Sequence, residues 1–224
     1  MQILIVSATS FEVKNLINEL HFTQIDENFY NKDIENNSVD ILITGVGIAF
    51  TSYNLTKALS RKKYDFVINA GIAGSLSEEL NIGDVVQVKT EEFADLGIRS
   101  KDSFSTLFDM GFIKADKFPF TDGKLNGIDN KTTLLNGLKK LRGITVNTVN
   151  GNKEEIKKLK QKFNADIESM EGAAVFYICL MEKVPFAEIR SISNYVEERN
   201  KGDWDIPLAI KNLNDYCKDI LDKI

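Results

Sequence analysis

Apolar and polar positions along this chain follow two periods in turn, one typical of strands and one typical of helices. The chain opens with the apolar run 3–6, which predicts a buried strand. The apolar residues that follow recur at helical spacing, at Val13, Leu16, Ile17 and Leu20. A strand followed directly by an amphipathic helix is typical of the first unit of an α/β layer.

The same two periods continue to the C-terminus. They predict further strands over 29–34, 39–46, 66–70, 83–88, 144–149 and 186–193. They predict helices over 48–60, 132–141, 153–163 and 170–181, and a C-terminal helix that carries Ile206, Ile210, Leu213, Cys217, Ile220 and Ile224. Residues 95–130 have weak periodicity and several glycines, so we expect loops near a pocket there.

This alternation favours a largely parallel or mixed sheet with helices on both faces, which is a three-layer α/β/α sandwich. The chain has 224 residues, of which 43% are hydrophobic, and this is enough for one sizeable core. We find no internal repeat and no linker, and therefore expect a single domain over residues 1–224.

Charge and the N-terminal pattern exclude several classes of partner. The formal net charge is −5 and the lysines form no basic stripe, so nucleic acid is not an expected partner. The N-terminal segment lacks a basic region, and its apolar run is too short for a signal peptide or a membrane span. We therefore expect no membrane partner.

Cysteine and histidine usage narrows the chemistry further. Cys179 and Cys217 are the two cysteines, and they form neither a disulfide framework nor a CxxC metal site, which fits a reducing cytoplasm. The single histidine, His21, follows the first helix, so a histidine-based catalytic triad is hard to build. Histidine-based catalysis is therefore not expected.

Two glycine-containing segments follow predicted strands. In 45–50, Phe50 stands where a dinucleotide-binding fingerprint needs a small residue, which argues against NAD. Either the backbone N–H groups of this segment approach an anionic or hydroxylated ligand, or its glycines only let the strand and the helix pack tightly. Both interpretations stay open. The glycines in 69–76 indicate a turn at a strand end, which is either structural or part of a binding loop.

Two acidic residues are candidates for catalysis or binding. Glu12 stands three residues after Thr9, the spacing of a helix capping box, and alternatively acts as a base on water. Glu171, with Met170 before it, lies at a predicted helix start. If Glu171 is buried, its carboxylate needs a partner, such as two ribose hydroxyls. If Glu171 is exposed, the helix dipole alone accounts for a carboxylate at this position.

Taken together, several segments resemble the nucleoside phosphorylase/hydrolase superfamily. They are Ser7 and Ala8 with Glu12, segment 70–74 with 82–85, Met170 with Glu171, and segment 190–194. Within the superfamily the chain is similar to methylthioadenosine/S-adenosylhomocysteine nucleosidases and especially to futalosine hydrolases. The latter similarity lies in segment 193–197 with Arg199, Trp204 and 206–210.

The resemblance implies a mixed, partly barrel-like central sheet, a homodimer or higher homo-oligomer, and cleavage of a purine N-glycosidic bond without metal or cofactor. It implies that Glu12 activates water, that Met170 and Glu171 hold the ribose, and that Arg190 lies beside the reacting centre. It also implies a substrate-binding set that includes Ala73, Gly74, Thr148 and Val149.

Two departures from the adenine nucleosidases bear on the substrate. Asn194 stands where those enzymes carry aspartate, and a neutral amide can donate to O6 or N7 of a 6-oxopurine where a carboxylate would repel O6. This favours futalosine, a hypoxanthine nucleoside of menaquinone synthesis, as substrate. Ile72 stands where they carry serine, which leaves water placement by that residue open.

Other functions stay open from the sequence. They are a purine nucleoside phosphorylase, an aminofutalosine, methylthioadenosine or S-adenosylhomocysteine nucleosidase, and a catalytically silent nucleoside-binding module. The segment 7–12 contains no arginine of the kind with which the phosphorylases hold phosphate, and this favours hydrolysis. Residues available by composition for a 5′ extension of the sugar are Phe93, Phe118, Phe120, Trp204, Arg199 and Lys201.

Overall fold

The computed structural model describes residues 1–101, 103–128, 135, 137–149, 151–197 and 204–224. Its helices are α1 (Ser10–Glu19), α2 (Ile48–Arg61), α3 (Lys153–Phe163), α4 (Gly172–Glu182) and α5 (Ile206–Leu221). Its first strands are β1 (Gln2–Ser7), β2 (Thr23–Asp26), β3 (Phe29–Ile34), β4 (Asn37–Ile43), β5 (Phe66–Ser75) and β6 (Val85–Phe93). The later strands are β7 (Gly97–Arg99), β8 (Phe104–Thr106), β9 (Phe120–Thr121), β10 (Lys124–Asn126), β11 (Lys139–Thr145), β12 (Ile167–Ser169) and β13 (Phe186–Tyr195).

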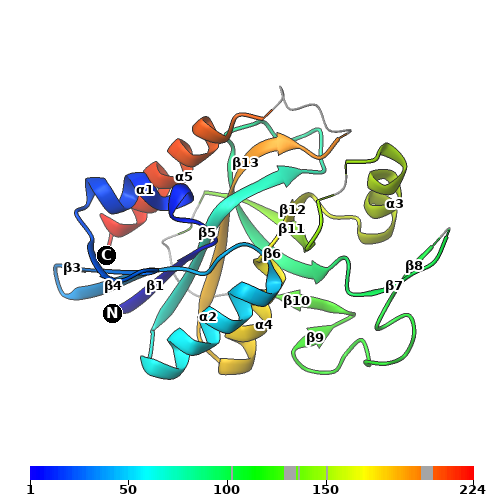
Figure 1. Cartoon of the computed structure of the whole chain (residues 1–224), viewed down its shortest axis with the longest axis horizontal. Helices are drawn as coiled ribbons and strands as arrows, with labels where there is room; N and C mark the ends of the chain where they lie inside the picture. Colours follow the sequence, from blue (N-terminus) through cyan, green and yellow to red (C-terminus); the bar gives the residue numbers. More distant parts are fainter. Residues whose placement is uncertain (102, 129–134, 136, 150, 198–203) are drawn as a thin grey trace.

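The main sheet is mixed and partly closed into a barrel (Figure 1). Its strands follow the order β2-β3-β4-β1-β5-β12-β11-β6-β10-β9, and β13 pairs with both β5 and β6. Strands β5, β12, β11, β6 and β13 therefore form a closed ring. The β13–β5 and β1–β5 pairs are parallel, whereas β12–β5 and β13–β6 are antiparallel. The expectation of a mixed, partly barrel-like sheet is confirmed.

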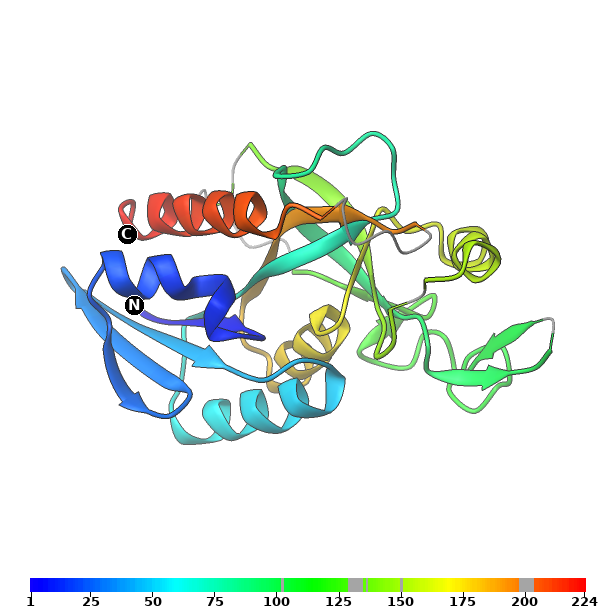
Figure 2. The same ribbon diagram turned by 45° about the horizontal axis from the view of Figure 1, so that its top comes forward.

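Helices cover both faces of the sheet, as the alternating pattern predicts. Helices α1 and α5 lie side by side on one face, and α2 and α4 lie on the other (Figure 2). Side chains of β1 alternate between these layers: Ile3 and Ile5 pack with α1 and α5, whereas Leu4 and Val6 pack with α2 and α4. No helix in the described ranges is long and apolar enough to cross a membrane.

A buried amide joins α5 to the start of α1. Asn214 is 4% exposed, and its Oδ1 accepts from the backbone amide of Leu16 at 2.8 Å. Its Nδ2 donates to the carbonyls of Glu12 at 2.7 Å and Ile210 at 2.6 Å. The C-terminal helix thereby fixes the turn of α1 that carries Glu12.

Several sequence-based boundaries are wrong. The helix predicted over 132–141 is wrong at its end, because residues 139–141 belong to β11. There Leu141 is buried between exposed Lys140 and Arg142, which is the alternation of a strand. Residues 132–134 and 136 lie outside the described residues. The strand predicted over 144–149 ends at Thr145. The region 95–130, expected to be irregular, contains the short strands β7 to β10.

The segment before α4 also differs from the prediction. Residues Ile167–Ser169 form β12, which the pattern did not predict, and α4 begins at Gly172 rather than at Met170. Strand β12 pairs with β11 and β5, so it completes the ring of strands next to the helix start.

Candidate active site

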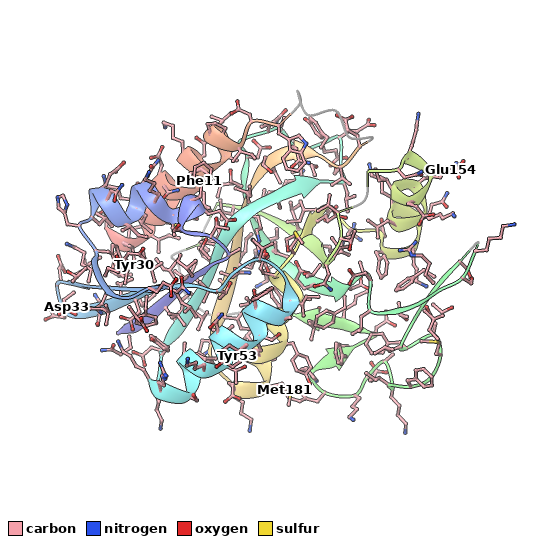
Figure 3. All side chains as sticks on the ribbon, in the orientation of Figure 1. Phe11, Tyr30, Asp33, Tyr53, Glu154 and Met181 are labelled. Carbon is pink, nitrogen blue, oxygen red and sulfur yellow. The ribbon has the colours of Figure 1, made fainter. Side chains whose placement is uncertain are left out.

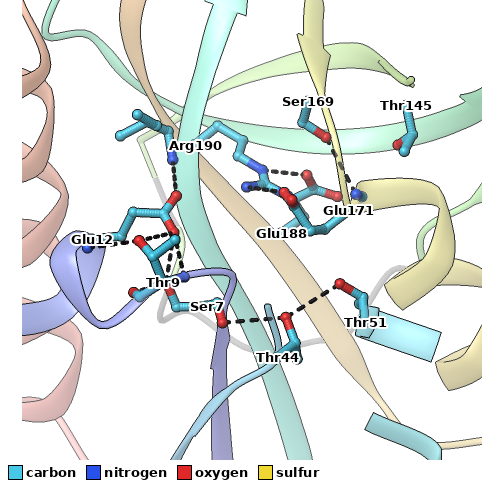
Figure 4. A network of polar contacts seen from close by, with 12 residues as sticks. Ser7, Thr9, Glu12, Thr44, Thr51, Thr145, Ser169, Glu171, Glu188 and Arg190 are labelled. Atoms are coloured by element: carbon cyan, nitrogen blue, oxygen red, sulfur yellow. Dashed lines mark hydrogen bonds and ion pairs between the residues drawn. The ribbon is translucent and has the colours of Figure 1, made fainter. Parts of the chain in front are cut away.

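Glu12 links the start of α1 to the middle of β5. The predicted capping box is present: the Thr9 side chain accepts from the amide of Glu12, and Oε2 of Glu12 accepts from the amide of Thr9 at 2.9 Å. The same oxygen accepts from Ser7 Oγ at 3.2 Å, while Oε1 accepts from the amide of Ile72 at 3.1 Å (Figure 4). The capping box therefore engages Oε2, and Oε1 is directed at β5.

Arg190 lies on β13 among carboxylates and is 1% exposed. Its Nε donates to Oε1 of Glu188 at 2.6 Å, and its Nη1 lies 3.7 Å from Oε2 of Glu171 (Figure 4). Burial lowers the pKa of Arg190, but the negative charges of Glu188, Glu171 and Glu12 outweigh it and raise this pKa. The guanidinium is therefore a fixed positive charge at the centre of the cluster.

Gly71 allows Glu12 and Arg190 to approach each other. A Cβ at this position would lie 2.1 Å from Nη1 of Arg190 and 2.9 Å from Oε1 of Glu12. The prediction of a turn here is wrong, because Gly71 and Gly74 lie inside β5. Because these glycines have no Cβ, side chains of neighbouring elements can meet over the strand at these positions.

Glu171 is buried at the N-cap of α4, with 5% of its surface exposed. Its Oε1 accepts from the amide of Gly47 at 3.0 Å, at the N-cap of α2, where no side chain of α2 caps the helix. Burial raises the pKa of Glu171, and the positive charge of Arg190 opposes that rise. The N–H of the glycine turn thus binds the carboxylate of Glu171, a side chain of the same chain, and the interpretation that this turn approaches a ligand stays a prediction.

Asn194 lies further along β13, beside Gly74. Its Oδ1 accepts from Ser193 Oγ at 2.8 Å, and its Nδ2 donates to the carbonyl of Tyr195 at 2.9 Å. A Cβ on Gly74 would lie 3.3 Å from Nδ2 of Asn194 and 2.7 Å from Cγ2 of Val196. A cleft of about 700 Å³ lies between segment 75–78, α3 and residues 195–197, directly after Asn194 in the chain, although Asn194 does not line it.

The β5–β13 ladder sets the spacing between the two groups. Arg190 pairs with Gly71, and Asn194 pairs with Gly74 after an irregularity between Ile192 and Asn194. Three residues of strand span about 10 Å. The cluster of Glu12 and Arg190 and the Asn194 amide are therefore attached to the same ladder at points about 10 Å apart along the strand.

The remaining predicted site residues lie around this ladder. Ala73 is buried in β5 with 4% exposure, and Met170 is half-buried between β12 and α4. Thr148 and Val149 are exposed in the loop after β11. The neighbouring residue in that loop, Asn147, accepts from the amide of Ile48 at 3.3 Å, so the loop adjoins the turn that binds Glu171.

Sequence reasoning missed two buried carboxyl groups inside the ring of strands. Glu188 holds Arg190, and Oε2 of Glu91 accepts from Thr145 Oγ1 at 2.8 Å, which itself accepts from the amide of Ala173 at 2.7 Å. Burial raises the pKa of both carboxyls, and for Glu91 the negative charge of Glu188 adds to that rise. The available signal was the spacing of Glu188 and Arg190, two charged residues two positions apart among the apolar residues Phe186, Ala187 and Ile189 at the start of the strand.

No group of three or more His, Cys, Asp or Glu side chains in the described part of the chain has the geometry of a metal site. Glu12, Arg190 and Asn194 offer a carboxylate, a fixed positive charge and a neutral amide. This combination suits proton removal from water at one end and hydrogen bonding to a polar ring at the other.

Comparison with known proteins identifies the family. Residues 2–222 match the family model described as the phosphorylase superfamily. The chain belongs to this superfamily. The resemblance based on the motifs is thereby confirmed.

Curated relatives and solved structures agree with this assignment. A futalosine hydrolase of Acidothermus cellulolyticus is 33% identical over 79% of this chain and 72% of its own length. A 5′-methylthioadenosine/S-adenosylhomocysteine nucleosidase of Haemophilus ducreyi is 30% identical over 83% of this chain and 81% of its own. The native structure of the Helicobacter pylori futalosine hydrolase has a TM-score of 0.83 at 19% identity, and the match covers 100% of this chain and 98% of that one.

Proposed function

We propose that this superfamily member is a futalosine hydrolase, an enzyme that cleaves the N-glycosidic bond of futalosine. It releases hypoxanthine and dehypoxanthine futalosine, as a step of menaquinone synthesis. The observation that carries the proposal is the pairing of the buried cluster of Glu12 and Arg190 with the Asn194 amide along one strand ladder. Futalosine hydrolases among the relatives support the substrate.

The cluster at Gly71 serves the sugar and the water. As the glycosidic bond stretches, positive charge develops on the ribose, and the carboxylates of Glu171 and Glu12 stabilise it. Glu12 takes the proton from the attacking water through Oε1, the oxygen that the capping box leaves free. Arg190 orients Glu12 and Glu171, and Met170 packs against the ribose.

The amide of Asn194 supports the departing purine. Its Nδ2 donates to N7 or O6 as negative charge develops on the base, and it stays neutral throughout. Asn194→Asp should therefore lower kcat/KM more for hypoxanthine nucleosides than for adenine nucleosides, because a carboxylate repels O6. Steady-state assays with futalosine and aminofutalosine measure this, and an equal loss on both substrates would contradict the assignment.

Incubation with a substrate panel tests the function directly. Purified protein is given futalosine, aminofutalosine, inosine and methylthioadenosine, with and without phosphate, and the released base is identified by chromatography. We expect hypoxanthine from futalosine at a rate that phosphate does not change. Formation of a sugar 1-phosphate would instead identify a phosphorylase, and binding without any released base would identify a nucleoside-binding module.

A second candidate is a methylthioadenosine/S-adenosylhomocysteine nucleosidase. Nucleosidase relatives with identities of 27–30% favour it. Structures of Helicobacter pylori nucleosidase match with a TM-score of 0.83. Release of adenine in the panel, at a rate above that of hypoxanthine, would decide for this candidate.

The proposal extends to the assembly and the setting of the enzyme. Residues 1–224 act as one domain, the protein works in the cytoplasm, and it forms a homodimer or higher homo-oligomer. Exposed aromatic side chains support an oligomer: Phe11 and Tyr53 project from α1 and α2 with 60% and 66% exposure (Figure 3). Aromatic residues are enriched at subunit interfaces, and sedimentation of the purified protein measures the oligomer size.

The 5′ extension of the sugar needs an apolar slot. Phe93 and Phe120 both stack against Tyr177 of α4, so they belong to one aromatic cluster. Phe118 and Trp204 are 62% and 38% exposed and are the freer candidates. Arg199 and Lys201 lie outside the described residues.

A further inference from the structure

Glu168 extends from β12 toward the same side of the sheet as Asn194. Strand β12 pairs antiparallel with β5, and the pairing aligns Glu168 with Gly74. Directly paired residues of antiparallel strands extend to the same face, with their Cβ atoms about 5 Å apart. Because a Cβ on Gly74 would touch Nδ2 of Asn194, the Glu168 carboxyl and the Asn194 amide share this face.

The carboxyl of Glu168 is buried without full hydrogen bonding. The side chain is 4% exposed, and its Oε2 has no hydrogen-bond partner among the described residues. An unsatisfied buried carboxylate oxygen costs free energy, so a protein that retains one has a use for it. The surroundings are otherwise apolar: Ile144, which pairs with Glu168, belongs to a cluster that also contains Leu76, Ala94 and Val196.

A loop with two residues of the predicted substrate-binding set is linked to Glu168 through Asp95. Asp95, whose negative charge acts on Glu168, accepts from the backbone amide of Asn147. Asn147 begins the loop that carries Thr148 and Val149, which the family resemblance implies in substrate binding. Glu168 is thus linked to this loop through Asp95 and to Asn194 through Gly74, and this places it in our proposal at the purine end of the site rather than at the ribose end.

We propose that Glu168 selects the base, by accepting a hydrogen bond from N1–H of a 6-oxopurine with its carboxylate. This inference rests on the proposed function and names the group that determines its substrate class. A 6-oxopurine carries a hydrogen on N1, whereas a 6-aminopurine presents a lone pair there. The carboxylate attracts the first and repels the second.

Asn194 cannot supply this discrimination alone. A carboxamide has a donor and an acceptor, and rotation by half a turn lets it serve either O6 or an amino group. An ionised carboxylate accepts only and has no second orientation to offer. Glu168 is thus the group at this face whose hydrogen bonding distinguishes the two classes of purine.

The electrostatic setting suits this role. Burial, with a smaller contribution from the negative charge of Asp95, raises the pKa of Glu168 to about 7. The carboxyl is close to its titration point at neutral pH, and an N–H donor from the base stabilises the ionised form. Binding of hypoxanthine should therefore release a proton below this pKa.

Glu168→Gln tests the inference, because glutamine keeps the shape and adds a donor that can serve N1 of adenine. We expect the ratio of kcat/KM for futalosine to kcat/KM for aminofutalosine to fall by about 10- to 100-fold. The matched control is Glu92→Gln, a half-buried carboxyl on β6 whose pKa burial also raises. Strand β11 lies between β12, which carries Glu168, and β6, which carries Glu92. Glu92 is therefore separated from Glu168 by one strand, and its substitution should leave the ratio unchanged.

Calorimetry with the free bases provides a second measurement that does not depend on turnover. Wild type should bind hypoxanthine more tightly than adenine. It should release a proton on binding hypoxanthine at a pH about one unit below the pKa of about 7, and release little or no proton at a pH above that pKa. This measurement also serves if Glu168→Gln fails to fold. Equal binding of both bases without proton release would overturn the inference.

The outcomes separate this inference from the proposed function. If wild type cleaves futalosine and Glu168→Gln keeps the wild-type ratio, the role of Glu168 is wrong and the function stands. If wild type cleaves none of the nucleosides, the proposed function is wrong, and the base-binding measurement still decides whether Glu168 selects 6-oxopurines.

Discussion

The two oxygens of the Glu12 carboxylate have different surroundings, one in the helix cap and one at the proposed catalytic position. One oxygen closes the capping box with Thr9, and the other faces β5 at Gly71 beside Arg190. A capping box alone would place this carboxylate at the surface, whereas Glu12 is only 6% exposed. The capping-box interpretation of the T-x-x-E spacing is therefore confirmed, and the role of Glu12 as a base on water remains our proposal.

Glu12→Gln separates the capping role from the proposed catalytic role. Glutamine keeps an acceptor for the cap but cannot take a proton from water, so kcat should fall by about 10²- to 10⁴-fold while the helix stays folded. Steady-state kinetics and circular dichroism measure the two effects. Glu19→Gln is the matched control, at the exposed end of the same helix, and near-normal turnover of Glu12→Gln would remove Glu12 from the mechanism.

The sequence identified Glu12, Glu171, Arg190 and Asn194, which the structure brings to one strand ladder. It missed other buried carboxyls, namely Glu91, Glu168 and Glu188. The first group belongs to motifs at strand and helix ends, where polar residues stand out. The second group lies within strands, and its role depends on which neighbouring strands close the ring, a non-local property that residue order does not reveal.

Elements were predicted well where tertiary pairing agrees with the local pattern of apolar residues, and poorly where it does not. Helix α3 covers the predicted range 153–163, because its apolar residues Ile156, Leu159 and Phe163 keep one face. Leu135, Leu138 and Leu141 show the same spacing, yet Leu141 belongs to β11. The partner strands β6 and β12 determine that outcome, so tertiary pairing overrides the local pattern.

Asn214 transmits the position of α5 to Glu12. Asn214→Ala removes hydrogen bonds to the Glu12 carbonyl and the Leu16 amide in a buried setting. We expect a loss of about 1–3 kcal/mol in unfolding free energy together with a lower kcat, because the turn that carries Glu12 loses its support. Urea unfolding and kinetics measure these quantities.

Asn212→Ala is the matched control for that substitution. It changes the same residue type on α5, but this side chain donates to the carbonyl of Gly83 and does not contact α1. A loss of kcat as large as that of Asn214→Ala would mean that α5 acts through general destabilisation rather than through Glu12.

At the scale of the whole molecule, the closed ring of strands encloses carboxyl groups whose pKa values burial raises. Glu91 and Glu188 are the innermost of these, and Glu171 and Glu168 lie at the rim. Between the ordinary and the raised pKa, the folded chain binds more protons than the unfolded chain. Unfolding free energy should therefore fall as pH rises through this window.

Glu91→Gln tests that dependence, because glutamine cannot titrate. We expect the fall in unfolding free energy as pH rises above the ordinary pKa of a glutamate to become shallower than in wild type, since each unit of raised pKa contributes about 1.4 kcal/mol. Urea unfolding at a series of pH values measures it. Glu154→Gln, at the exposed start of α3, is the surface control, and an unchanged slope in Glu91→Gln would mean that Glu91 is not responsible.

The hydrogen bond from Gly47 to Glu171 restricts how this protein can diverge. The carboxylate proposed to hold ribose also completes the start of α2, so replacing it would weaken a helix as well as a binding contact. Among the described residues, Asn194 bonds to Ser193 and Tyr195 of its own strand, and neither it nor Glu168 completes a helix end. On the proposed roles, single substitutions can therefore change which base the site accepts, whereas its specificity for a pentose is tied to the stability of α2.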